Sequence, residues 1–102
     1  MSLKNISVLN FEEEVLESEQ TVLLDFWADW CGPCMMLAPL LHEFAEENPN
    51  VTVGKVNVDE APELAQAYGV SSIPTLVVVK DGKEVNRSVG VIPKNKIEEL
   101  VK

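Results

Sequence analysis

The chain has 102 residues and a hydrophobic content of 46%, which suit a single compact domain over residues 1–102 and argue against disorder. Its net charge of −9 comes from residues 1–51, where ten acidic side chains and one basic side chain give −9; residues 52–102 carry seven of each sign. An acidic chain without a basic cluster is a poor match for nucleic acid or an anionic membrane, so we expect neither as a partner.

Residues 1–15 contain no apolar core of signal-peptide length, and no stretch approaches the roughly 20 apolar residues of a membrane span. We therefore expect a cytoplasmic protein. In that compartment a lone pair of cysteines, here Cys31 and Cys34, is more often catalytic than structural.

The first predicted elements are short. Ile6 and Val8 mark a strand, and Asn10 with Glu13 matches a capping box at the start of a helix. The apolar positions of that helix are Phe11, Val15 and Leu16.

Residues 21–28 are almost continuously apolar, as expected for a central strand covered on both faces. Asp25 interrupts this stretch. An ionised carboxylate there is costly unless it is paired, so its pKa should rise. A structural acid bonded to nearby backbone is one interpretation, but the position six residues before Cys31 favours a proton-handling role.

The stretch Trp30-Cys31-Gly32-Pro33-Cys34 holds both cysteines at the predicted start of a helix. Cβ atoms three positions apart on a helix lie roughly 5–6 Å from each other, within reach of a disulfide after modest adjustment. Helix N-terminal amides favour a thiolate at the first cysteine. Proline suits the first helical turn, and glycine lets a partner backbone approach. The pattern predicts thiol–disulfide exchange.

The helix from Cys34 to Glu47 should kink at Pro39 without ending there. Its apolar face consists of Leu37, Leu40, Leu41, Phe44 and Ala45. Its outward face carries Met35, His42 and Glu46, so His42 is interpreted as a solvated surface residue.

Residues 51–58 predict a second central strand, interrupted by Lys55. Two interpretations stay open: Lys55 pairs with Asp25, or it buries its stem and extends its head to solvent. Asp59 is the expected cap of a short helix that ends at Gly69.

The remaining pattern is a loop at residues 71–74, a strand at 76–79, a turn at Asp81-Gly82, a strand at 84–89 and a helix from Pro93. This order describes a mixed sheet flanked by helices.

Taken together, these features resemble the thioredoxin family over the whole length of the chain. The resemblance rests on Val22 to Ala28, the Trp30 to Cys34 motif, Pro39, Tyr68-Gly69-Val70, Ile73-Pro74-Thr75-Leu76 and Gly90. It implies the thioredoxin fold, an α/β arrangement with a central mixed five-stranded sheet flanked by four helices in three layers.

The resemblance also implies roles. Cys31, exposed at the helix start, is the nucleophile, and Cys34 is the resolving thiol. Asp25 takes the proton of Cys34, and Lys55 lies close by and tunes it. A cis Ile73-Pro74 bond faces the cysteines, and the Ile73 backbone offers an amide and a carbonyl to an extended target. Trp27 packs beneath the motif. The contact surface comprises Trp30, Gly32, Pro33, Ile73, Pro74, Gly90 and Val91.

A member of this family needs no bound cofactor, because the cysteine pair is the redox group. The resemblance implies electrons from NADPH through a flavin-dependent thioredoxin reductase, with a ferredoxin-linked reductase as the other source. Typical targets are ribonucleotide reductase, peroxiredoxin and methionine sulfoxide reductase. We expect a monomer.

The chain departs from the usual pattern at three positions. Met35 replaces a common lysine, Val91 replaces a small residue, and Ser71 replaces a basic one. Without a cation at position 35, thiolate stabilisation at Cys31 should weaken. Met35 is equally interpretable as an apolar part of the docking surface.

Three rival functions remain. A zinc site needs four ligands, and beyond the two cysteines only His42 is available as a soft ligand. A disulfide oxidase or isomerase commonly has histidine between the cysteines, so Gly32-Pro33 favours a reductant. A binding module that does not use the thiols is the third, because fold alone does not fix function.

Overall fold

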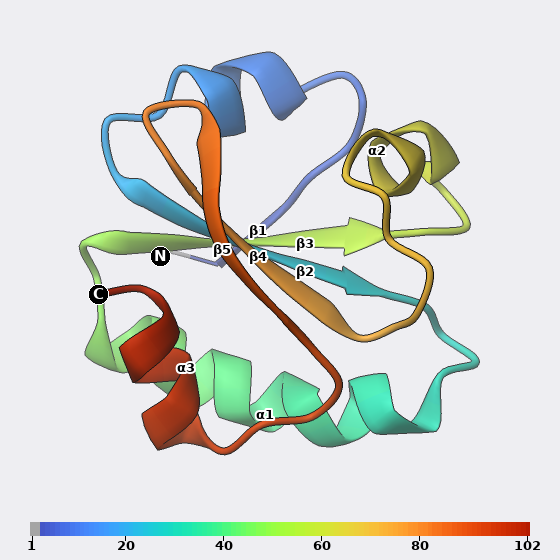
Figure 1. The fold of residues 1–102 in the computed structure, drawn as a ribbon, viewed down its shortest axis with the longest axis vertical. Helices are drawn as coiled ribbons and strands as arrows, with labels where there is room; N and C mark the ends of the chain where they lie inside the picture. The colour runs from blue at the N-terminus through green and yellow to red at the C-terminus, as the bar shows by residue number, and fades with distance from the viewer. Residues whose placement is uncertain (1–2) are drawn as a thin grey trace.

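The computed structural model describes residues 3–102, which form three layers with the sheet in the middle (Figure 1). Helices α1 (Gly32–Glu47) and α3 (Lys94–Leu100) cover one face of the sheet. The short π-type helix η1 (Glu12–Leu16) and α2 (Pro62–Ala67) cover the other. Within this part of the chain, five strands and four helices confirm the predicted α/β fold.

Strand β2 (Thr21–Trp27) is central because its side chains are apolar on both faces. It pairs in parallel with β3 (Val51–Asn57) and antiparallel with β4 (Thr75–Lys80). The edges are β1 (Leu3–Asn5), parallel to β3, and β5 (Lys83–Val89), antiparallel to β4. The sheet order is therefore β1-β3-β2-β4-β5.

The alternation of side chains along β2 builds one apolar core on each face. Val22, Leu24 and Phe26 pack with residues of η1 and α2. Leu23 packs on the opposite face with residues of α1 and α3. Asp25 has the same parity as Leu23, so it lies on the face that α1 covers.

Helix α1 continues through Pro39 and ends only at Glu47, as predicted. Its C-terminal end is joined to the last helix by Lys94, which pairs with both Glu43 and Glu47. The buried positions of α1 are Cys34, Leu37, Leu41, Phe44 and Ala45. Its exposed positions include Met35, His42 and Glu46, as predicted.

The first strand lies earlier than the sequence predicts. The strand is Leu3–Asn5, whereas Val8 is 52% exposed. Ile6 still donates its amide to the Lys55 carbonyl at 2.8 Å, one step beyond the end of the strand. Ile6 is buried because it packs against Gly54: a Cβ placed on that glycine would lie 2.7 Å from Ile6 Cγ1. The apolar side chain of Ile6 is therefore explained by its contact with Gly54, and it does not indicate the position of the strand.

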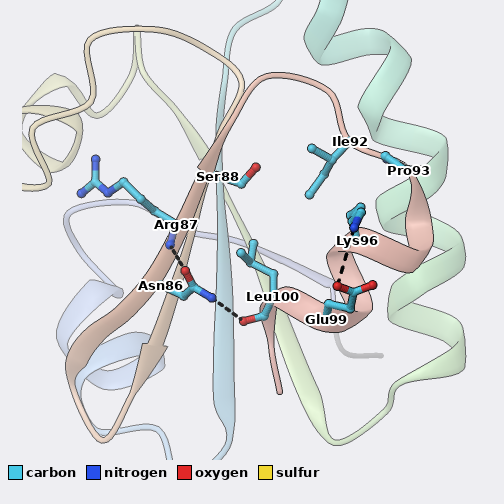
Figure 2. A pocket seen from close by; sticks show the side chains of 8 residues that line it. All are labelled: Asn86, Arg87, Ser88, Ile92, Pro93, Lys96, Glu99 and Leu100. Atoms are coloured by element: carbon cyan, nitrogen blue, oxygen red, sulfur yellow. Dashed lines mark hydrogen bonds and ion pairs between the residues drawn. The ribbon is translucent and has the colours of Figure 1, made fainter.

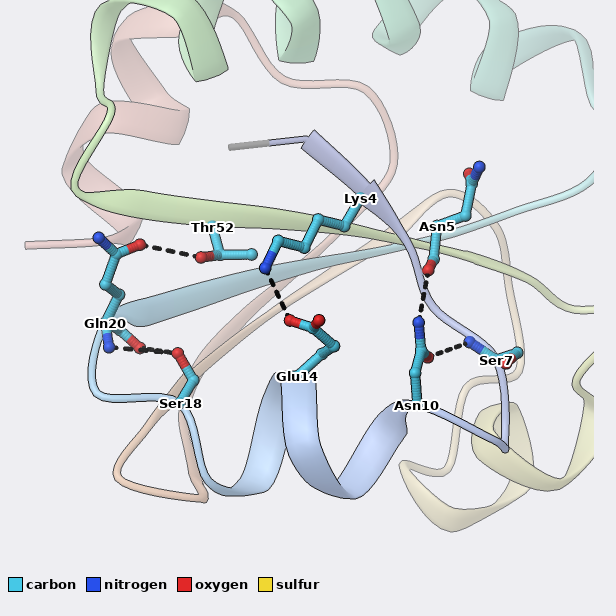
Figure 3. A network of polar contacts seen from close by, with 8 residues as sticks. All are labelled: Lys4, Asn5, Ser7, Asn10, Glu14, Ser18, Gln20 and Thr52. Atoms are coloured by element: carbon cyan, nitrogen blue, oxygen red, sulfur yellow. Dashed lines mark hydrogen bonds and ion pairs between the residues drawn. The ribbon is translucent and has the colours of Figure 1, made fainter. Parts of the chain in front are cut away.

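The predicted capping box at Asn10 is also wrong, since η1 has no side-chain cap. The Asn10 side chain instead stabilises the preceding turn (Figure 3). Its Oδ1 accepts the Ser7 amide at 2.8 Å, and its Nδ2 donates to the Asn5 carbonyl at 3.0 Å. Backbone groups of a turn need partners, and Asn10 provides two. In the same region Lys4 pairs with Glu14 at 2.7 Å, which joins β1 to η1.

Candidate active site

Both cysteines lie at the N-terminus of α1, just beyond the carboxyl end of β2. Cys31 is the N-cap residue, and Cys34 lies in the first turn. They are joined as a disulfide with their Cα atoms 5.3 Å apart, a normal separation for this bond. The Cys31 Sγ also accepts the Cys34 amide at 3.2 Å. This amide and the helix dipole favour a thiolate at Cys31 after reduction.

The expectation that Cys31 is exposed is wrong. Only 5% of its surface is accessible, compared with 3% for Cys34. The two cysteines and Ala28 form a small buried cluster, against which Trp27 and Ile73 pack. A loop from a distant part of the chain therefore covers the helix start.

The covering loop precedes β4. Its Ile73-Pro74 bond is cis, as the resemblance implies. The Ile73 carbonyl oxygen lies 3.8 Å from Cys31 Sγ. Gly90, at the end of β5, donates its amide to the Pro74 carbonyl at 2.8 Å. The φ of Gly90 is +95°, a left-handed conformation that favours glycine. The end of β5 thus holds the loop against the disulfide.

Asp25 and Lys55 lie opposite each other on β2 and β3. Asp25 Oδ2 is 3.9 Å from Lys55 Nζ, so the structure contains the direct pair that the sequence left open. The same Nζ is 4.6 Å from the centre of the Trp27 ring, a cation–π distance. Burial raises the pKa of Asp25 from 3.8 to about 6, and the Lys55 charge acts in the opposite direction.

The second carboxylate oxygen of Asp25 is buried without a hydrogen-bond partner among residues 3–102. The same is true of the Trp27 indole nitrogen. Buried polar atoms without partners are uncommon in folded proteins, and each calls for an explanation. A carboxyl with a pKa near 6 and an unbonded oxygen exchanges protons near neutral pH. Asp25 therefore has the properties of a proton acceptor.

Exposed apolar side chains lie close to the two cysteines in the sequence or in the adjoining loops. Trp30 is 71% exposed and Met36 is 67% exposed. Met35 and Val91 are exposed by 45% and 39%. Gly32 and Pro33 are exposed as well, whereas Pro74 is buried. Among the predicted contact residues, all of which the structure describes, Pro74 is the buried one.

A shallow groove of about 170 Å³ lies beside this surface. Its lining residues are Trp30, Val58, Ala65, Val70, Ser71, Ser72 and Ile73. The Trp30 indole N–H donates to Asp59 Oδ2 at 2.8 Å. The prediction that Asp59 caps α2 is wrong, because α2 has no side-chain cap and the carboxylate bonds to the indole instead.

Sequence reasoning missed Asn57, which it included only as part of the predicted strand at residues 51–58. Asn57 is buried at the end of β3, and its Oδ1 accepts the amides of Asp59 and Glu60 at 2.9 and 3.3 Å. An asparagine bonded to the backbone two residues onward forms an Asx turn. The Asn57-Val58-Asp59 order after a predicted strand was the available signal.

A larger groove of about 600 Å³ lies between β5 and α3 (Figure 2). Asn86 Nδ2 donates across it to the Leu100 carbonyl at 3.3 Å. The remaining lining residues are Arg87, Ser88, Ile92, Pro93, Lys96 and Glu99. None of them is a predicted site residue.

The comparisons with known proteins agree with this geometry. The family model described as Thioredoxin matches residues 2–102. The chain belongs to the thioredoxin family. A thioredoxin of Chlorobaculum thiosulfatiphilum is 47% identical over 93 residues, which cover 90% of this chain and 86% of that protein. Thioredoxin 1 of Synechococcus elongatus is 54% identical over 85 residues, with 82% and 79% covered. A thioredoxin of Chlamydia trachomatis is 49% identical over 96 residues, with 94% and 92% covered.

Family membership and the joined Cys31–Cys34 pair identify a thiol–disulfide oxidoreductase. Thioredoxins use this redox-active disulfide in place of a bound cofactor. Across residues 3–102, no group of three or more His, Cys, Asp or Glu side chains is placed to hold a metal ion. No helix in the described part of the chain is both long enough and apolar enough to cross a membrane.

Proposed function

We propose that this thioredoxin-family protein reduces disulfides in target proteins, with Cys31 as the nucleophile and Cys34 as the resolving thiol. The observation that carries this assignment is the position of the Cys31 Sγ. It accepts an amide at the N-terminus of α1 and lies 3.8 Å from the carbonyl oxygen of Ile73 in the adjacent loop. Amides that bond to this sulfur lower the pKa of its thiol.

The reaction moves two electrons in two exchanges. The Cys31 thiolate attacks one sulfur of the target disulfide and forms a mixed disulfide, and the other target sulfur leaves as a thiolate and takes a proton. The Cys34 thiolate then attacks the Cys31 Sγ. This second exchange forms the Cys31–Cys34 disulfide and releases the second target thiol.

In this proposal Asp25 takes the proton of Cys34 before the second exchange, and Lys55 tunes its pKa. The supporting observations are the pKa near 6, the unbonded oxygen and the ion pair at 3.9 Å. A base is most effective when its pKa lies near the working pH. A carboxyl at its ordinary pKa would be a weaker proton acceptor.

The exposed residues around the disulfide bind the target. An extended segment with its cysteine over Cys31 would pair with the backbone of Ile73, as in the addition of a short strand. Pro74 and Gly90 hold that backbone in place through the Gly90 amide. The side-chain contacts come from Trp30, Gly32, Pro33 and Val91.

Membership of the thioredoxin family supports the partners that we propose. The protein receives electrons from NADPH through thioredoxin reductase, a flavoprotein, or from a ferredoxin-linked reductase. Its targets are proteins with reducible disulfides such as ribonucleotide reductase, peroxiredoxin and methionine sulfoxide reductase. It works in the cytoplasm, where the glutathione pool keeps most thiols reduced, and it acts as a monomer.

Trapping with Cys34→Ser tests the assignment. Without a resolving thiol, the mixed disulfide on Cys31 persists, and mass spectrometry identifies its partner. The matched control is Cys31→Ser, which retains only the Cys34 thiol. Equal trapping by the two variants, or none by Cys34→Ser, would show that the nucleophile is misassigned.

Replacing both cysteines by serine separates reduction from thiol-independent binding. We expect the double variant to lose both the reduction of insulin disulfides and the cellular function. Full cellular function in the double variant would instead identify a binding module.

A further inference from the structure

Trp30 combines high exposure with a demanding position. It directly precedes Cys31, forms part of the groove wall and is 71% exposed. Packing alone cannot fix a side chain with so much free surface, so its rotamer depends on polar contacts. The polar contact of its indole is the 2.8 Å bond from Nε1 to Asp59 Oδ2.

Asp59 is itself exposed, and the turn after β3 sets its position. Asn57 organises this turn through four hydrogen bonds. Its side-chain Oδ1 accepts the amides of Asp59 and Glu60, and its backbone carbonyl accepts those of Glu60 and Ala61 at 3.1 and 2.8 Å. Asn57 is 8% exposed and paired with Trp27 in the sheet, so it provides a rigid base for the turn.

The other end of the same side chain reaches the residue before Trp30. Asn57 Nδ2 donates to Asp29 Oδ2 at 3.4 Å. The contact with Asp29 restrains the residue before Trp30, and the bond to Asp59 restrains the Trp30 indole. Both restraints therefore depend on the buried side-chain amide of Asn57.

We propose that Asn57 is a positioning residue that holds Trp30 in the orientation required for binding protein targets. The inference rests on the proposed function, in which Trp30 contacts the target. Asn57 touches neither sulfur, so its loss should weaken binding and leave the chemical step unchanged. The expected signature is a higher KM with an unchanged kcat.

The orientation of Trp30 is measured directly by NMR of the oxidised protein. The indole N–H resonance is assigned by its disappearance in Trp30→Phe. Asn57→Ala should shift this resonance and speed its hydrogen exchange, because the indole loses its fixed acceptor. Asn57→Asp keeps an oxygen for the two turn amides and loses the donor to Asp29, so its resonance should lie closer to that of the unmodified protein.

Thr52→Val is the matched control. Thr52 is buried on the same strand, and its hydroxyl donates to Gln20 Oε1 at 3.0 Å. The substitution removes one polar contact from the opposite end of β3. We expect it to leave the Trp30 resonance unchanged. Should Asn57→Ala fail to fold, Asp59→Ala breaks the same link, and Asp59→Asn, which retains an oxygen acceptor, should restore it.

Kinetics provide the second measurement. With insulin as the protein disulfide, Asn57→Ala should raise KM by about three- to tenfold and leave kcat unchanged. With a small aromatic disulfide that does not reach the groove, Asn57→Ala should react at the same rate as the unmodified protein. A loss of equal size for both substrates, or one matched by Thr52→Val, would mean that Asn57 is only structural and would overturn the proposal.

The NMR measurement tests the positioning role of Asn57 independently of the proposed function. An unchanged Trp30 resonance in Asn57→Ala overturns the positioning role whatever the activity. If the resonance moves but insulin binds as before, Trp30 is not a target contact, and the role of Asn57 in binding is overturned while the redox assignment stands. An unmodified protein that does not reduce insulin contradicts the proposed function first.

Discussion

Asp25 is a buried acid whose carboxylate lies 3.9 Å from the Lys55 ammonium group. Its pKa in the folded protein is about 6, compared with 3.8 for an ordinary aspartate. Between these values the folded state binds more protons than the unfolded chain, so the free energy of unfolding falls as the pH rises. Above pH 6 the loss in the free energy of unfolding reaches its full value of about 3 kcal/mol.

Asp25→Asn should therefore stabilise the protein at neutral pH. The substitution removes the charge and keeps the size of the side chain, so we expect the free energy of unfolding to rise by about 2–3 kcal/mol at pH 7. The gain should shrink toward zero below pH 3.8, where the carboxyl is protonated in both states. Urea unfolding across this range measures it. A gain independent of pH would contradict charge burial as the cause.

Met35 affects the other end of the site. It is 45% exposed in the first turn of α1, and that turn contains no acidic residue. Met35→Lys adds a cation near the dithiol, so the pKa of Cys31 in the reduced protein should fall. The rate of alkylation as a function of pH measures it. His42→Lys, farther along the exposed face, is the control, and an unchanged midpoint in Met35→Lys would contradict the prediction.

At the scale of elements, strand register was more predictable than helix caps. Asp25 and Lys55 were recognisable because each interrupts an apolar strand, and neighbouring central strands bring such residues together. Caps failed because a short polar side chain has several possible partners. Asn10 bonds to the Ser7 amide three residues before it, and Asp59 bonds to the Trp30 indole 29 residues before it, so neither side chain is available to cap the helix that follows.

The contact between Ile6 and Gly54 of β3 predicts a sensitive glycine. A Cβ at Gly54 would lie 2.7 Å from Ile6 Cγ1 and 3.1 Å from Leu24 Cδ2. Gly54→Ala should therefore lower the free energy of unfolding by about 1–3 kcal/mol through crowding. Denaturant unfolding checks this. The control is Gly32→Ala, where a Cβ meets nothing within 4 Å and no comparable loss is expected.

Substitution of Gly90 should lower the free energy of unfolding for a different reason. Its φ is +95° and a Cβ would meet nothing within 4 Å, so Gly90→Ala is penalised by the backbone and not by crowding. We expect a loss of about 1–2 kcal/mol in stability and a higher KM for insulin, because the Gly90 amide orients the Pro74 carbonyl. Gly69→Ala, with φ of +64° in open space, should lose stability without a change in KM. Equal KM values in both variants would contradict a role for Gly90 in the loop.

At the scale of the molecule, the order of elements and the cysteine motif predicted the fold. The burial of Cys31 was not predictable, because its cover is the loop around Ile73, which lies 42 residues away in the chain. The link from Trp30 to Asp59 likewise spans 29 residues. Such contacts depend on how loops from separate strands meet, and periodicity reports only one element at a time.

The net charge of −9 predicts how partners are selected over distance. A disulfide peptide flanked by lysines should react faster than the same peptide flanked by glutamates, because the summed field attracts the cationic peptide. The ratio of the two rates should approach one at high salt, where the field is screened. Stopped-flow reduction at low and high ionic strength measures it. A ratio that ignores salt would rule out long-range steering.

The chain has two tryptophans, and both adjoin the disulfide: Trp27 packs against the cysteine cluster, and Trp30 directly precedes Cys31. Disulfide bonds quench the fluorescence of nearby indole rings. Essentially all of the tryptophan emission of this molecule therefore originates beside its redox group. Reduction of the disulfide should increase the tryptophan fluorescence of the protein, so its oxidation state can be followed in real time without a dye.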